Sequence, residues 1–216
     1  NVFNTGAIGL ENLKKIKFYD KKFFKKKYKI NFEKKTIIIC FHPVTLEPKT
    51  EKKYFKEILH SLSYFKDCNL VFSSPNADHG YLEIIKLTKK YVKKNKNAFF
   101  IKSFGRLEFI SCLKLSKVIL GNSSSGIIEA PSLKTPTVNI GDRQSGRIKG
   151  ETVISCKSNV DSIKKAIKKG LSKSFDEKCK RSKNPYGTGE ASKKIIKSLR
   201  SIKLENILIK KFHNLK

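Results

Sequence analysis

Six short apolar runs punctuate the chain, and segments with helical spacing separate them. The runs are continuous and rich in β-branched or aromatic residues, which is typical of strands in a parallel sheet covered on both faces. These predicted strands occupy residues 36–41, 69–74, 97–103, 117–122, 135–141 and 152–156. Helices with one apolar side are predicted over residues 51–65, 81–92, 107–115, 160–171 and 189–202.

The regular alternation of strand and helix predicts an α/β fold with right-handed crossovers, a Rossmann-like parallel-sheet domain. We expect this domain to span residues 31–189. The lysine-rich lead-in over 14–35 predicts one amphipathic helix, and residues 1–30 predict a connector from a preceding domain. Residues 190–216 predict helices that pack across an interdomain cleft.

Composition adds two expectations about the protein's origin and partners. The sequence has no methionine and begins at Asn1, so we expect it to be the C-terminal piece of something larger. Lys and Arg outnumber Asp and Glu by 48 to 18, for a formal charge of +30, which would attract nucleic acid or an acidic membrane. The lysines, however, are scattered over every predicted helix, and no nucleic-acid-binding motif is present. We therefore attribute the charge to drift in an AT-rich genome and expect no specific nucleic-acid partner.

The five cysteines are odd in number and widely spaced, without a C-x-x-C pair. This pattern predicts a reducing compartment with thiols as small core residues, and it argues against a disulfide framework or a metal site. No apolar run approaches the length of a membrane span, and no signal peptide is visible. We expect a cytoplasmic protein with no membrane partner.

Polar, turn-rich loops follow the first five predicted strands. In parallel sheets the ligand lies beyond the carboxyl ends of the strands, so these loops should converge on one site. The loops read "HPVTLEP" (42–48), "SPNADHG" (74–80), "SFGR" (103–106), "NSSSG" (122–126) and "GDRQSGR" (141–147).

The fourth loop has the residues of an anion-binding site. A buried strand is followed by Ser123, Ser124, Ser125 and Gly126 and then by a short predicted helix, whose N-terminal amides and dipole favour phosphate. Ser124 or Ser125 could instead cap that helix, which would account for one serine. Glu129 lies about one turn into the helix and could accept both hydroxyls of a ribose; a capping box would need Ser or Thr where Gly126 stands.

The other loops supply further polar candidates. Arg143 and Arg147 stand out because almost all other basic residues are Lys, and only guanidinium grips phosphate through a planar fork. Asp142 and Gln144 could order that loop or contact the substrate. His42 precedes Pro43 and could bind phosphate as a cation, assist proton transfer, or be structural. Asn76 could hydrogen-bond a base or a phosphate.

Four motifs together resemble the C-terminal half of hydrolysing UDP-N-acetylglucosamine 2-epimerases. They are "FHPVTLE", "SPNADHG", "GNSSSGIIEAPSLKTPTVNIGDRQSGR" and "NPYGTGEAS", and the resemblance covers nearly the whole chain. It implies the two-domain glycosyltransferase-B architecture, with UDP held by this half. The resemblance further implies that Ser123, Ser124, Ser125 and Gly126 hold the diphosphate and that Glu129 holds the ribose. By the same resemblance, His42, Asn76, Arg143 and Arg147 line the site, with His42 as the catalytic residue.

The resemblance also implies a reaction and its partners. UDP-GlcNAc would lose UDP by elimination, and hydration of the resulting glycal would yield N-acetylmannosamine for sialic-acid-type sugars. The acids that move the carbon-2 proton would lie in the missing N-terminal domain, so we expect this chain alone to be inactive. No metal or cofactor is expected. The expected partners are UDP, a UDP-sugar and further copies of the protein.

Four alternatives stay open at the level of sequence. A sister enzyme acts on a UDP-linked diacetamido-trideoxy sugar, and a glycosyltransferase of the same architecture would transfer the sugar to an acceptor. The charge permits a nucleic-acid-binding protein, and the absent start permits a truncated gene product without activity. The sugar substituents, the oligomeric state and any allosteric ligand cannot be read from the residues.

Overall fold

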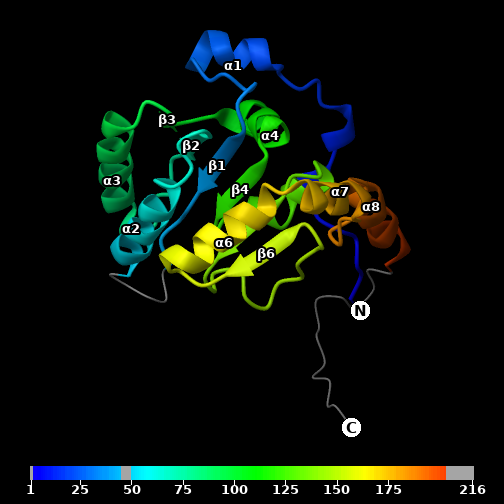
Figure 1. The fold of residues 1–216 in the computed structure, drawn as a ribbon. Helices are drawn as coiled ribbons and strands as arrows, with labels where there is room; N and C mark the ends of the chain where they lie inside the picture. The colour runs from blue at the N-terminus through cyan, green and yellow to red at the C-terminus, as the bar shows by residue number, and fades with distance from the viewer. Residues whose placement is uncertain (1, 45–49, 203–216) are drawn as a thin grey trace.

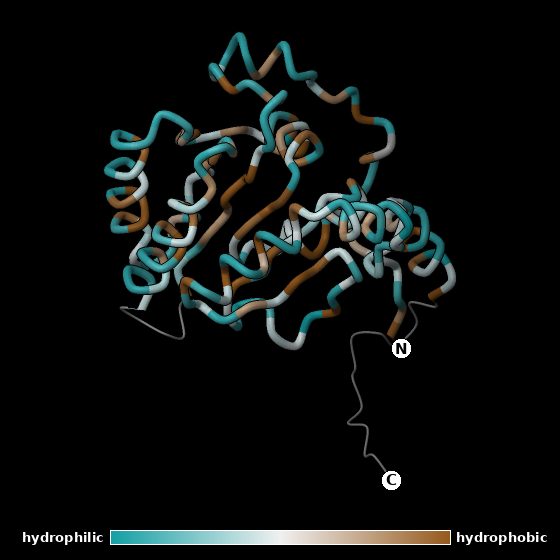
Figure 2. The backbone as a smooth tube through the Cα atoms, in the orientation of Figure 1, coloured by the Kyte–Doolittle hydropathy of each residue, from teal (hydrophilic) through white to brown (hydrophobic). Residues whose placement is uncertain are grey.

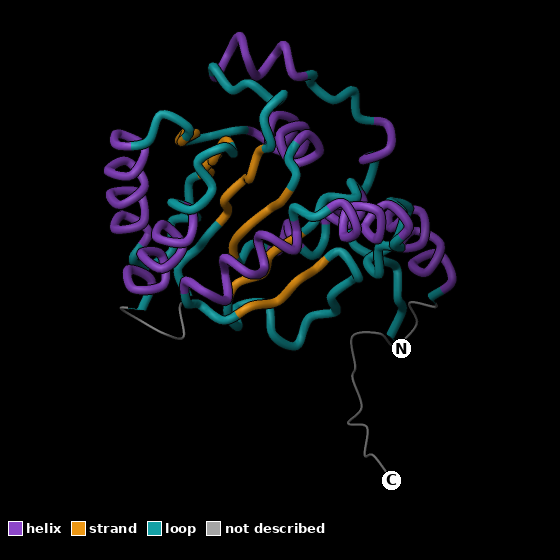
Figure 3. Tube along the Cα trace, in the orientation of Figure 1, coloured by secondary structure: helices purple, strands orange, loops and turns teal. Residues whose placement is uncertain are grey.

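The computed structural model describes residues 2–44 and 50–202, and its centre is one parallel sheet of six strands (Figures 1 and 3). The strand order is β3-β2-β1-β4-β5-β6, and every pair is parallel. This arrangement confirms the predicted fold class and all six predicted strands. The strands are β1 (Thr36–Cys40), β2 (Asn69–Ser73), β3 (Ala98–Ile101), β4 (Val118–Gly121), β5 (Thr137–Ile140) and β6 (Val153–Cys156).

Helices connect the strands and cover both faces of the sheet. The α-helices are α1 (Lys21–Tyr28), α2 (Glu51–Leu62), α3 (Tyr81–Lys94), α4 (Gly105–Leu115), α5 (Glu129–Ser132), α6 (Val160–Gly170), α7 (Lys173–Arg181) and α8 (Ala191–Ser201). Single 3-10 turns are η1 (Ile8–Leu10), η2 (Leu13–Lys15) and η3 (Ser124–Gly126).

One local prediction was wrong, and one helix was missed. Residues 14–35 do not form one helix: α1 begins after Asp20, whose carboxylate accepts the backbone N–H of Phe23 (2.9 Å), and ends at Lys29, whose φ is 60°. Helix α7 was not predicted, because only two of its nine residues, Phe175 and Cys179, are buried. Its first turn is capped by the Ser172 hydroxyl, which accepts the N–H of Phe175.

Alternate residues of β1, β2, β3 and β4 enter two separate cores, as the pleat requires. On one face, Ile37 and Ile39 of β1 pack with residues of α2, α3 and α6; on the other, Ile38 and Cys40 pack with residues of α1 and α4. In Figure 2 the central strands are mostly coloured as hydrophobic, whereas the helices around them alternate hydrophilic and hydrophobic residues. The five cysteines are unpaired thiols, four of them buried, which confirms their prediction as core residues.

The opening segment packs against the rest of the chain. The N–H of Ala7 donates to the carbonyl of Tyr186 (2.8 Å), and Leu10 and Leu13 share a small core with Ile110. The N–H of Ser192, in α8, donates to Glu11 Oε2 (3.1 Å). The boundaries at residues 30 and 190 stay predictions, and residues 203–216 of the predicted C-terminal helices lie outside the described residues.

The strand order reverses between β1 and β4, and Gly121 permits their close approach there. Its φ is 142°, and a Cβ at this position would lie 2.0 Å from the backbone carbonyl oxygen of Cys40. The obstacle is backbone in the middle of a sheet, which cannot swing aside as a side chain would. Only glycine fits, and the switch point of the sheet, where ligands bind in such folds, is built directly beside it.

Gly121→Ala is expected to lower the free energy of unfolding by about 3 kcal/mol or more, because β1 and β4 must separate to admit the methyl group. The matched control is Gly146→Ala, also at positive φ (75°) but with no atom within 4 Å of the added Cβ. It should cost only the left-handed backbone penalty of about 1–2 kcal/mol. Urea unfolding followed by circular dichroism measures both, and equal losses would contradict the steric explanation.

Candidate functional site

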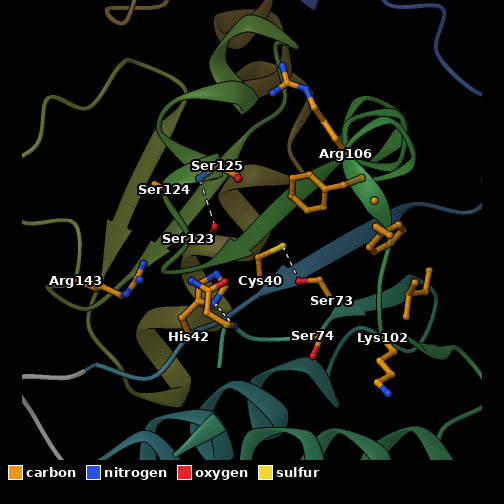
Figure 4. A pocket seen from close by; sticks show the side chains of 15 residues that line it. Cys40, His42, Ser73, Ser74, Lys102, Arg106, Ser123, Ser124, Ser125 and Arg143 are labelled. Carbon is orange, nitrogen blue, oxygen red and sulfur yellow. Dashed lines mark hydrogen bonds between the residues drawn. The ribbon is translucent and has the colours of Figure 1, made fainter. Parts of the chain in front are cut away.

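A cavity of about 420 Å³ opens at the carboxyl ends of the central strands (Figure 4). Loops after β1, β2, β3, β4 and β5 all contribute to its lining, as the predicted topology requires. Of the nine candidate residues, the structure brings six to this cavity. They are His42, Asn76, Ser123, Ser124, Ser125 and Arg143.

His42 is held as a neutral imidazole. Its side chain is 8% exposed, and Nδ1 accepts the backbone N–H of Asn76 (3.0 Å). Burial, reinforced by the positive charge of Arg143 and opposed by Asp78, lowers the pKa of His42 to about 4. With Nδ1 occupied as an acceptor, the proton of the neutral ring is on Nε2. A neutral His42 argues against the predicted role as a phosphate-binding cation, and its Nε2 offers a hydrogen-bond donor, a role that was not predicted from the sequence.

The serine loop is a 3-10 turn, and its cap is neither of the serines considered for that role. Ser123 precedes η3, and its hydroxyl accepts the N–H of Ser125 (3.4 Å). Ser124 and Ser125 also line the cavity. Gly126 is buried away from the cavity lining: a Cβ there would lie 2.6 Å from Thr137 Cγ2. Packing against β5 is therefore sufficient to explain this glycine.

Glu129 starts the four-residue helix α5 and does not line the cavity. Its neighbours are Arg106, whose charge acts on it, and Gly9, where an added Cβ would lie 3.6 Å from Glu129 Oε1. Burial raises the pKa of the Glu129 carboxyl, against the lowering effects of a hydrogen bond from Ser125 and of Arg106. Within the described part of the chain, Glu129 Oε2 is buried without a hydrogen-bond partner. A buried acceptor without a donor is costly, so this oxygen is one of the few buried side-chain polar atoms of the described chain left unsatisfied.

The two loop arginines differ in their placement. Arg143 is half-buried, lines the cavity and donates from Nη1 to the carbonyl of Asn122 (3.2 Å), whereas Arg147 is exposed and outside the lining. Gln144 is buried, and its Nε2 donates to the same Asn122 carbonyl (2.8 Å), so it orders the loop. Asp142 is exposed on a neighbouring cavity of about 430 Å³ that shares Arg143.

Sequence reasoning missed several cavity residues at the end of β3 and in the segment that follows it. Ile101, Phe104 and Phe109 form an apolar wall, with Phe104 and Phe109 in edge contact at 6.0 Å between ring centroids. Lys102 and Arg106 bring positive charge beside this wall, and Arg106 donates to the carbonyl of Gly9 (3.0 Å). The only available signal was the position of "SFGR" directly after a strand. Of the first loop, residues 45–48 lie outside the described residues.

A doubly wound parallel sheet with serine hydroxyls, a guanidinium and an apolar wall at its switch point is typical of nucleotide-binding domains. The family comparison agrees: residues 1–200 match the family model described as UDP-N-acetylglucosamine 2-epimerase. The chain belongs to this family, which confirms the resemblance seen in its motifs.

Curated relatives carry related names. The chain is 37% identical over 216 residues to the GDP/UDP-N,N'-diacetylbacillosamine 2-epimerase (hydrolyzing) of Campylobacter jejuni, covering 99% of this chain and 56% of that protein. It is 32% identical over 210 residues to the UDP-N,N'-diacetylbacillosamine 2-epimerase (hydrolyzing) of Legionella pneumophila, covering 97% and 54%. The chain thus spans about half the length of these curated relatives.

Solved structures share the fold. The UDP-GlcNAc 2-epimerase from Neisseria meningitidis, bound to UDP-GlcNAc, aligns with a TM-score of 0.76 at 23% identity, over 92% of this chain and 55% of that one. The enzyme from Methanocaldococcus jannaschii in complex with UDP-GlcNAc and UDP aligns with a TM-score of 0.67 at 21% identity, over 92% and 54%. No helix in the described part of this chain is long and apolar enough to cross a membrane.

The pKa of His42 predicts a specific acid sensitivity. Because the folded-state pKa is about 4 and the unfolded value about 6.5, the unfolded state binds more protons between these limits. The His42 contribution to stability should be complete above pH 6.5 and decline by at most about 3 kcal/mol as the pH falls to 4. Urea unfolding at pH 7, 5.5 and 4.5 should show the difference between wild type and His42→Gln shrinking with acidity. A difference independent of pH would contradict the burial argument.

Proposed function

We propose that this chain is the UDP-binding half of a hydrolysing UDP-sugar 2-epimerase. Family membership supports the reaction class, since both diacetylbacillosamine relatives are named as hydrolysing 2-epimerases. The observation that carries the nucleotide role is the convergence of Ser123–Ser125 and Arg143 on one cavity whose other wall is aromatic. Hydrogen-bond donors that can bind an anion lie at one end, and a flat apolar surface lies at the other. These two ends match the diphosphate and the base of a nucleoside diphosphate.

The cavity suggests how UDP is oriented. The diphosphate lies at the serine hydroxyls and the Arg143 guanidinium, where the His42 Nε2 proton is a further donor. The uracil lies along Phe104 and Phe109, on the side of Lys102 and Arg106. The ribose is then assigned to Glu129, which does not line the cavity itself but lies beside Arg106, which does, and whose buried Oε2 has no partner among the described residues. This contact would require the carboxylate to turn toward the cavity. The same orientation assigns Asn76 to the phosphate side, because its backbone N–H is bonded to His42.

The main catalytic contribution of this half would be electrostatic. Elimination breaks the bond between sugar carbon 1 and a UDP oxygen, and negative charge then develops on the departing diphosphate. Donors fixed before the reaction stabilise that charge without having to reorganise. Arg143 is fixed in this way by the Asn122 carbonyl, and His42 by Asn76. The groups that move the carbon-2 proton, and the contacts to most of the sugar, would belong to the other half of the enzyme.

Two sugars are candidates for the substrate. The names of the relatives support the diacetamido sugar at least as strongly as N-acetylglucosamine. The Campylobacter and Legionella proteins are named for N,N'-diacetylbacillosamine, whereas the family model is named for N-acetylglucosamine. An Escherichia coli relative, 36% identical over 208 residues, is named polysialic acid biosynthesis protein P7 and supports a role in sialic-acid-type sugars. UDP release from each UDP-sugar by an enzyme containing both halves would separate the two substrates.

Arg143→Lys is expected to weaken UDP binding about tenfold or more, since lysine keeps the charge but loses the planar fork. Isothermal titration calorimetry of this chain with UDP at near-physiological salt measures the change. Arg181→Lys, at the exposed end of α7, is the matched control and should bind like wild type. Arg147→Lys should have a smaller effect than Arg143→Lys, because Arg147 does not line the cavity. Absence of saturable UDP binding by wild type, together with salt-sensitive nucleic-acid binding, would favour the nucleic-acid alternative.

Glu129→Ala is expected to weaken UDP binding several-fold, by an amount typical of lost hydrogen bonds to a charged group, and to leave pyrophosphate binding unchanged. Only UDP carries the ribose hydroxyls that the carboxylate would accept. Competition titrations with the two ligands on one preparation make pyrophosphate the internal control. Equal losses for both ligands would remove the ribose assignment.

A further inference from the structure

Asn122 bonds to several segments around the cavity, although it lines only the neighbouring cavity and not this one. It follows β4 directly and is 1% exposed. Its Oδ1 accepts the backbone N–H of His42 (2.8 Å), and its Nδ2 donates to the backbone carbonyl of His42 (2.8 Å). The side chain thus satisfies both main-chain groups of the residue that leaves β1.

The main chain of Asn122 makes a second set of contacts. Its N–H donates to the carbonyl of Cys40 (3.2 Å), and its carbonyl accepts Gln144 Nε2 (2.8 Å) and Arg143 Nη1 (3.2 Å). One residue at the end of β4 is therefore bonded to the end of β1 and to the loop after β5. The two groups that it holds, His42 and Arg143, both line the cavity.

We propose that Asn122 is a positioning residue that sets the place of the His42 imidazole relative to the Arg143 guanidinium, an inference that rests on the proposed UDP site. Backbone held at both its N–H and its carbonyl leaves the His42 side chain only its own torsions. The hydrogen bond from the Asn76 amide to Nδ1 then restricts those as well. Asn122 would thus direct the Nε2 proton through the His42 backbone, although Asn122 itself does not line the cavity that His42 lines.

The side-chain chemistry explains why asparagine stands here. The site requires one acceptor and one donor, side by side, at the reach of a carboxamide. Aspartate has the same shape but no donor when ionised, and it would place a carboxylate oxygen against the His42 carbonyl. Serine is neutral but too short to make both contacts. An ionised side chain would also favour the imidazolium form of His42.

Asn69 is a matched control for a purely structural role. It is buried (4% exposed) at the start of β2, at the amino ends of the strands and so at the other end of the sheet from the cavity. Its Nδ2 donates to the carbonyl of Asn31 and to Thr36 Oγ1. Asn69→Asp makes the same chemical change in the same sheet and touches neither His42 nor Arg143.

The test compares Asn122→Asp, Asn122→Ser and Asn69→Asp in three measurements on this chain. Urea unfolding gives stability, calorimetry gives UDP affinity, and NMR titration of the His42 ring, assigned with His42→Gln, gives its pKa without ligand. Both Asn122 variants should bind UDP at least tenfold more weakly, and Asn122→Asp should raise the pKa of His42. Asn69→Asp should leave UDP affinity and the His42 pKa unchanged even where it is equally destabilised.

Several results would overturn the proposal. It fails if folded Asn122 variants bind UDP like wild type, or if Asn69→Asp loses as much affinity at equal stability. If wild type itself binds no UDP, the proposed function fails, and the ligand-free NMR measurement still decides the positioning role. An unchanged His42 ring in Asn122→Ser and Asn122→Asp would then refute it, and a shifted ring would support it. Asn122→Ser keeps the test valid if the buried charge of Asn122→Asp prevents folding.

Discussion

The close approach of β1 and β4 at their carboxyl ends is the constraint on which the site depends. Gly121 admits the carbonyl of Cys40 where any Cβ would collide with it. Asn122, the next residue, then reaches the backbone of His42 and supports the loop that carries Arg143. The missing side chain of Gly121 and the hydrogen bonds of Asn122 therefore hold three segments together that are far apart in sequence. The switch in strand order supplies the space, and Asn122 organises its edge.

The electrostatics of the cavity differ from those of the chain as a whole. Most of the +30 formal charge comes from lysines, whereas the cavity combines the cations Lys102, Arg106 and Arg143 with the neutral imidazole of His42. Burial keeps His42 uncharged, so its contribution to an anion is a directed hydrogen bond rather than a further net charge. Glu129 shows the opposite adjustment: burial favours its protonated form, while Ser125 and Arg106 favour the carboxylate. Burial thus shifts the pKa of both groups, and a nucleotide bound beside them would change that burial.

The proposed division of labour follows from what this half can contact. In the proposed orientation, the polar donors of the cavity would take the diphosphate and its apolar wall the base, which would leave the sugar at the opening. The relatives are about twice as long, and a sugar placed between two halves would be read largely by the other one. This explains why the nucleotide assignment has structural support here while the choice between one and two acetamido groups depends on relatives.

The sequence by itself determined the architecture and the loops of the site. Continuous apolar runs alternating with one-sided helical spacing were enough for six parallel strands, because these patterns follow from local burial. Topology then placed the loops of His42, Asn76, Ser123–Ser125 and Arg143 at one edge. Only the tertiary structure decided which side chains reach the cavity: it excluded Arg147, explained Gly126 by packing against Thr137, and added Phe104 and Arg106. It also decided that His42 is neutral and that Asn122 holds it. These properties depend on burial and on contacts between residues 80 apart, which no local pattern encodes.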